Sequence, residues 1–88
     1  MIRGSTRVAG ELGLHLRAAA RLVSITGEAS GPVRITANGV TVDGKSLLGI
    51  TSLLAAAGTE VCIELDLEED AAVLAAALAC LGGGDDDA

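Results

Sequence analysis

The chain has 88 residues, which is enough for one small domain and too few for two. Half of its residues are hydrophobic (50%), yet Phe, Trp and Tyr are absent, so its core must consist of Val, Ile, Leu and Ala. The net charge of −6 and the lack of aromatic side chains to stack on bases argue against nucleic-acid binding.

The beginning of the chain and its cysteines bear on where the protein works. Residues 1–10 contain no apolar core of a signal peptide, and no apolar run reaches the ~18 residues of a membrane span. Cys62 and Cys80 lack the spacing of metal ligands and are too few for a disulfide scaffold. We therefore expect a cytoplasmic protein with reduced thiols, no membrane association, no metal and no cofactor.

Charge is divided unevenly along the chain. Residues 1–46 carry six cations and three acids, whereas residues 47–88 carry nine acids and no cation. A positive half of this kind attracts an anion or an acidic protein surface.

The first elements in chain order are a strand and a helix. Residues 2–8 mix β-branched and cationic residues in rough alternation, which predicts a strand, and residues 9–14 form a glycine-containing loop. Residues 16–26 have apolar side chains at helical spacing, and Gly27 is a suitable helix end. The inward stripe of this helix is expected to comprise Ala19, Leu22, Val23 and Thr26.

Residues 32–44 give the clearest local signal. Apolar and polar residues alternate on both sides of Asn38-Gly39. These two residue types tolerate the positive φ angles that a type I′ turn requires. The pattern predicts a β-hairpin.

Residues 46–58 are expected to form a second helix, which Ser46 caps by accepting an amide hydrogen bond and Gly58 ends. The expected buried face comprises Ile50, Leu53 and Leu54. Leu47 and Leu48 point elsewhere, and an apolar pair outside the core indicates a partner surface. An ordinary helix with a wide buried face fits the same pattern equally well.

The last elements are a strand and a third helix. Residues 60–66 alternate cleanly, as in an antiparallel sheet with one solvated face. The pattern of residues 67–81 predicts a helix. Its first turn carries acidic side chains, which the positive end of the helix dipole stabilises there. Its apolar stripe comprises Leu74, Ala77, Leu78 and Leu81, and its first-turn acids are Glu68, Glu69 and Asp70.

The order β-α-β-β-α-β-α predicts an α+β fold in which three helices cover one face of a four-stranded antiparallel sheet. The domain is expected to comprise residues 1–81, followed by a flexible acidic tail at 82–88.

The chain contains no catalytic triad and no Walker loop, so an enzyme with its own substrate pocket is not expected. What remains is His15, the one histidine, at the start of the first helix. A neutral imidazole is a competent nucleophile, helix-start amides bind anions, and the guanidinium of Arg17 suits phosphate oxygens. These groups make a plausible phosphoryl acceptor, although a solvated surface histidine also fits the residues alone.

Two stretches together are quite specific. GLHLRAAARL at 13–22 and GKSLLGITSLL at 44–54 resemble HPr, the histidine-containing phosphocarrier of the bacterial sugar phosphotransferase system, and the resemblance covers residues 2–81. It implies the open-faced β-sandwich of that family. His15 would accept a phosphoryl group on Nδ1 from phosphorylated Enzyme I and pass it to an Enzyme II A-domain, while Arg17 stabilises the phosphoryl oxygens.

The same resemblance assigns a regulatory site and a docking surface. Ser46 matches the family's serine that is phosphorylated in some bacteria by an ATP-dependent HPr kinase/phosphorylase. The residues expected to dock partners are Leu16, Ala20, Arg21, Leu47, Leu48 and Thr51. The carrier is expected to be a monomer.

Two positions depart from the family pattern. Leu16 stands where a small residue is usual, and Ala18 where proline is usual, which puts transfer rate and partner identity in question. Three hypotheses follow: a phosphocarrier in sugar uptake or a nitrogen-related phosphorelay, a regulatory protein acting through Ser46, and a structural interaction module.

Overall fold

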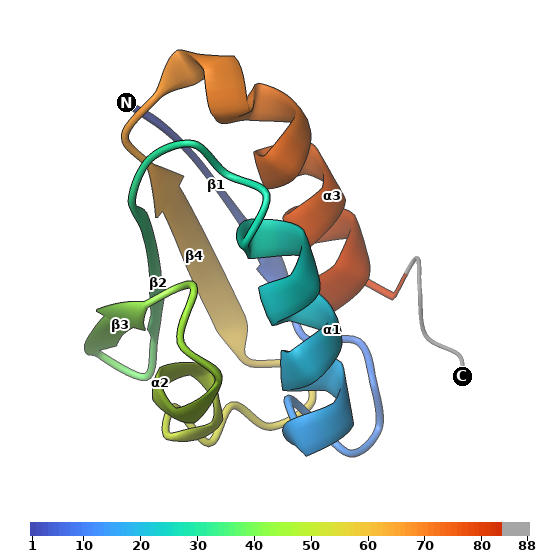
Figure 1. The fold of residues 1–88 in the computed structure, drawn as a ribbon. Helices are drawn as coiled ribbons and strands as arrows, with labels where there is room; N and C mark the ends of the chain where they lie inside the picture. Colours follow the sequence, from blue (N-terminus) through green and yellow to red (C-terminus); the bar gives the residue numbers. More distant parts are fainter. Residues whose placement is uncertain (84–88) are drawn as a thin grey trace.

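The computed structural model describes residues 1–83, so the predicted tail lies outside the described residues except for Gly82 and Gly83. Figure 1 shows the order of elements. They are β1 (Ile2–Arg7), α1 (Leu16–Thr26), β2 (Val33–Ala37), β3 (Val40–Asp43), α2 (Leu47–Thr51), β4 (Glu60–Leu65), the 3₁₀ turn η1 (Glu68–Asp70) and α3 (Ala71–Leu81). The four strands and α1 lie within one residue of, or coincide with, the sequence prediction.

The sheet has the strand order β1-β4-β2-β3, and every neighbouring pair is antiparallel. Alternate residues of β2 and β4 are buried, so one face of the sheet packs on the core and the other is open. The α+β fold with four antiparallel strands and three helices is confirmed.

The helices enclose a hydrophobic core of Val, Leu, Ile and Ala side chains. Helices α1 and α3 run side by side across one face of the sheet, and α2 packs against α1 and β3 (Figure 1). The largest fully buried side chains are Leu22, Ile35, Ile50, Ile63, Leu65, Val33, Val61 and Thr26. Within residues 1–83, no helix is long and apolar enough to cross a membrane.

The hairpin prediction is confirmed in detail. Asn38 and Gly39 adopt φ angles of 54° and 78°, as a type I′ turn requires. The Asn38 side chain also donates from Nδ2 to the Leu53 carbonyl oxygen over 3.1 Å. The turn of the hairpin is therefore tied to the segment that follows α2.

The second helix is shorter than predicted, because it ends at Thr51 and not near Gly58. The Leu53 amide bonds to the Ile50 carbonyl three residues back, and Leu54 then takes a positive φ of 53°. The Leu53 carbonyl oxygen accepts a hydrogen bond from the Asn38 side chain, so a tertiary contact takes the place of the next helical hydrogen bond. Leu54, which was expected on the buried face, is 81% exposed, so that expectation is wrong.

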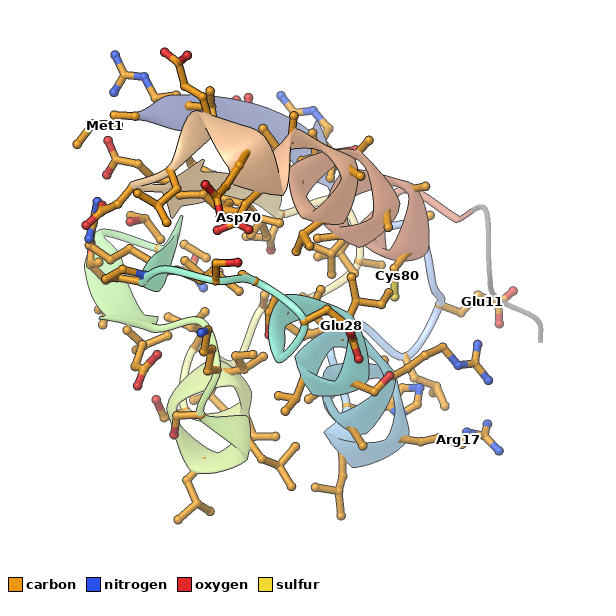
Figure 2. The ribbon with its side chains drawn as sticks, turned by 45° about the horizontal axis from the view of Figure 1, so that its top comes forward. Met1, Glu11, Arg17, Glu28, Asp70 and Cys80 are labelled. Atoms are coloured by element: carbon orange, nitrogen blue, oxygen red, sulfur yellow. The ribbon has the colours of Figure 1, made fainter. Side chains whose placement is uncertain are left out.

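The third helix also begins differently. A 3₁₀ turn precedes α3, and Asp70 within it is buried instead of facing solvent. Its carboxylate accepts hydrogen bonds from the amides of Ser30 (2.9 Å) and Gly31 (3.1 Å). Figure 2 shows Asp70 beneath η1. A buried carboxylate that satisfies two backbone donors fixes the loop between α1 and β2.

The loop before α1 is held against the segment after α2. Gly13 has a φ of 72°, and a Cβ atom there would lie 2.6 Å from the Ala55 carbonyl oxygen. The next residue, Leu14, is buried and donates its amide to that same oxygen over 2.8 Å. Glycine is required at position 13 both by its conformation and by this close approach.

Replacing Gly13 with alanine is expected to lower the free energy of unfolding by about 2–3 kcal/mol, because backbone strain adds to a collision with Ala55. Urea unfolding followed by far-UV circular dichroism measures this, since the chain has no aromatic fluorophore. Gly39→Ala is the matched control: its φ is also positive, but its Cβ would meet nothing within 4 Å. Equal losses in the two variants would contradict the proposed collision.

Candidate functional site

His15 occupies the N-cap position of α1. Its backbone is extended (φ −77°, ψ 177°), and its Nδ1 atom accepts a hydrogen bond from the Ala18 amide over 3.3 Å. The neutral ring therefore keeps a lone pair on Nδ1 and its proton on Nε2. The side chain is half-buried, which leaves the imidazole accessible.

His15 lines two neighbouring hollows. The first, of about 320 Å³, is bounded by the loop before α1 and the end of α3, and it is lined by Arg17, Arg21 and Glu11 as well as by apolar side chains. The second, of about 490 Å³, has a largely apolar lining. Its lining residues are Leu12, Leu14, His15, Leu16, Thr51, Leu54, Ala55 and Ala56.

Arg17 and Arg34 differ in their surroundings. Arg34, on the open face of the sheet, is bonded to Glu64 (3.3 Å) and Asp66 (2.6 Å), which raises the pKa of its guanidinium. Arg17 has no carboxylate partner among residues 1–83, and Figure 2 shows it extending from α1 away from the sheet. Its donors are available to an anion held at the start of the helix.

Ser46 caps α2 as predicted, because its Oγ atom accepts the Gly49 amide over 3.0 Å. The two leucines that follow Ser46 differ in their exposure. Leu47 is half-buried and packs against the core, whereas Leu48 is 80% exposed. Both leucines were predicted to lie outside the core stripe, and only Leu48 does so fully.

The remaining predicted docking residues cluster near His15. Leu16 is 64% exposed at the start of α1, and Ala20 and Arg21 are exposed on the same helix. Thr51 is half-buried, and its hydroxyl donates to backbone carbonyls within α2. Figure 1 places α2 and the start of α1 at the same end of the molecule.

Sequence reasoning missed three contributors to this region. Leu12 and Leu54 line the apolar hollow, and the Ala18 amide contacts the imidazole. Leu12 belongs to an irregular loop without periodicity, and Leu54 was assigned to a longer helix, so neither could be placed beside His15. The residue type at 18 did carry a signal, since only a residue other than proline has this amide donor.

The described part of the chain contains no group of three or more potential metal-ligating side chains. The arrangement instead combines one nucleophilic nitrogen, helix-start amides and an arginine without a carboxylate partner. Such a site can accept an anionic group from another protein but offers no enclosed pocket for a substrate of its own.

Comparison with known proteins agrees with this chemistry. Residues 2–82 match the family described as the PTS HPr component phosphorylation site. The phosphocarrier protein HPr of Cupriavidus necator is 35% identical over 81 residues, covering 92% of this chain and 91% of that protein. HPr of Neisseria meningitidis serogroup A is 31% identical over 83 residues, covering 94% and 93%.

Solved structures give the same answer. HPr from Bacillus anthracis superposes with a TM-score of 0.84 at 28% identity, covering 91% of this chain and 95% of that one. The Bacillus subtilis catabolite repression containing protein Crh, described as a domain-swapped dimer, has a TM-score of 0.70 at 28% identity, covering 92% and 93%. The chain therefore belongs to the HPr family of the phosphotransferase system and is a phosphocarrier, which carries a phosphoryl group and does not itself catalyse a reaction.

Proposed function

We propose that His15 is the phosphoacceptor, charged on Nδ1 by phosphorylated Enzyme I and discharged to an Enzyme II A-domain during sugar uptake. The observation that carries the proposal is the position of this one histidine, beside a hollow lined by two arginines and an apolar hollow. The first suits the transferred anion, and the second suits a protein surface.

Transfer begins at the Nδ1 lone pair, which attacks phosphorus as the donor's own bond to phosphorus breaks and its electron pair returns to the donor. The Ala18 amide must first release Nδ1, because its hydrogen bond occupies that lone pair. The ring then holds the phosphoryl group on Nδ1 and the proton on Nε2, until that proton leaves to solvent. Discharge reverses these bond changes on the acceptor.

The groups at the start of α1 stabilise the phosphoryl group in this proposal. A phosphoryl group on Nδ1 lies at the helix terminus, where unpaired amides and the helix dipole favour negative charge. Ala18 supplies one amide there, and Arg17 adds a permanent positive charge with forked donors. The departure from proline at position 18 thus adds a donor to the acceptor site instead of removing a function.

Docking is assigned to the side chains around His15. Leu16 and Leu48 offer exposed apolar area, Ala20 leaves room on α1, and Arg21 adds charge beside Arg17. Leu47 and Thr51 shape the other side of the surface from α2. Leu16, bulkier than usual for the family, becomes part of this apolar contact.

We further propose that the carrier works in the cytoplasm as a monomer, with residues 1–81 as one functional unit. The free thiol of Cys62 supports a reducing compartment.

Replacing His15 with alanine is expected to abolish phosphorylation, because it removes the ring nitrogen that is proposed to attack phosphorus. Incubation with Enzyme I, magnesium and phosphoenolpyruvate, followed by intact mass, measures the gain of one acid-labile phosphoryl group. Arg17→Gln should slow transfer by roughly 10- to 100-fold, the value of one charge-assisted contact.

Arg3→Gln is the matched control for Arg17, because it removes the same charge from exposed strand β1. It should leave the transfer rate nearly unchanged. Undiminished labelling of the His15→Ala protein would refute the acceptor assignment. Equal slowing of transfer in the Arg17 and Arg3 variants would show that Arg17 acts only through the net charge of the protein and not through contact with the phosphoryl group.

A regulatory role through Ser46 is the second candidate, favoured by its place immediately before Leu47 and Leu48 and by the likeness to Crh. A phosphate on Ser46, added by a kinase, would put negative charge beside the proposed docking surface. Partner binding would then fall while the fold remained intact.

Two substitutions at Ser46 separate capping from regulation. Ser46→Ala removes the cap and should cost about 1 kcal/mol of stability, whereas Ser46→Asp keeps a capping oxygen and adds charge. We expect the aspartate variant to unfold at the wild-type urea concentration yet accept phosphoryl groups more slowly than the alanine variant. Equal transfer rates in wild type and both variants would contradict a regulatory role for charge at this position.

A further inference from the structure

Leu54 has a backbone conformation unsuited to its side chain. Its φ is 53°, in the left-handed region where Cβ crowds the following carbonyl oxygen. Among residues 1–83 the other positive φ angles belong to Asn38 and to glycines, which tolerate them. Leu54 is the exception, and a bulky residue in this region stores conformational energy.

The turn itself is needed, but the leucine side chain is not needed to make it. The neighbours Leu53 and Ala55 are buried, and their carbonyl oxygens accept from the Asn38 side chain and from the Leu14 amide. Glycine would give the same turn without strain. The Leu54 side chain is 81% exposed, so burial within this chain does not offset the strain.

The position of the Leu54 side chain indicates a role in contacting a partner. It lines the same hollow as His15, together with the exposed leucines Leu12 and Leu16. We propose that these three leucines form an apolar contact for Enzyme I, the protein that charges His15, and that Leu54 becomes buried against an apolar patch beside the donor's phosphorylated group. This inference rests on the proposed function of His15.

Transfer geometry brings the donor surface over the surroundings of His15, which include this hollow. Reacting atoms must approach to about 3–3.5 Å, so the donor surface around its phosphoryl group contacts the surface around Nδ1. The opposing patch must be apolar, because leucines and alanines dominate the lining and the Thr51 hydroxyl already donates to backbone carbonyls. Arg17 and Arg21 lie at the other hollow, where the anion is expected.

Two variants separate the side chain from the backbone. Leu54→Gly removes the strain and the side chain, whereas Leu54→Ala removes most of the side chain and keeps a Cβ at positive φ. Each is assayed as a substrate of Enzyme I with phosphoenolpyruvate and magnesium, to give KM and kcat. Thermal unfolding is followed by far-UV circular dichroism.

We expect both variants to raise KM for the carrier about tenfold with little change in kcat, the effect of losing one buried leucine contact. Only Leu54→Gly should melt at a higher temperature, by roughly 4–8 °C for a domain of this size. A purely structural role for Leu54 predicts instead that KM stays at the wild-type value in both variants, and that result overturns the proposal.

Leu67→Ala is the control, because this exposed leucine directly precedes η1. The segment that leads into α3 lies at the opposite end of the molecule from α2 (Figure 1). The KM of the Leu67→Ala variant should equal that of the wild type. Failure of the proposed function is distinguishable: it appears as absent labelling of the wild type or persistent labelling of His15→Ala. Normal His15-dependent labelling with an unchanged KM in both Leu54 variants overturns only the docking inference.

Discussion

The Leu14 amide donates to the Ala55 carbonyl over 2.8 Å, and this bond joins the loop before His15 to the segment that follows α2. Because Leu14 directly precedes His15, the bond fixes the position of the His15 backbone at the start of α1. Gly13 allows the two backbones to meet, since any Cβ there would collide with the same oxygen. His15, the proposed acceptor, and the apolar surface beside it are therefore positioned by the same contact between distant segments of the chain.

Much of the fold follows from local sequence. Asn38-Gly39 defines the hairpin because few residues tolerate two successive positive φ angles, and α1 is evident because its apolar spacing and Gly27 agree. The end of α2 could not be predicted in this way. The residues after Thr51 continue a helical pattern, and only contacts with Asn38 and Leu14, distant in sequence, end the helix there.

The site divides in the same manner. Residue types single out His15, Arg17 and Ser46 as candidates. Ser46 caps α2 as predicted, whereas the capping of α1 by His15 is evident only in the structure. The two hollows beside His15, of which one is lined by Arg17 and Arg21, could not be predicted from the sequence, since they depend on how α3 and the segment after α2 pack around α1. Buried Asp70 is a similar case: three adjacent acids look alike in sequence, and only one meets two loop amides.

The hydrogen bond from Ala18 to Nδ1 has a thermodynamic consequence for the carrier. In the protein without a phosphoryl group the imidazole caps α1. With His15 as the proposed acceptor, a phosphoryl oxygen would accept from the Ala18 amide after transfer. By linkage, any stability that the helix gains from the phosphoryl group is subtracted from the free energy released when the group moves on. A carrier with a strongly favourable cap in both states exchanges one acceptor for another at little net cost, and its group-transfer potential stays high enough to charge the next protein.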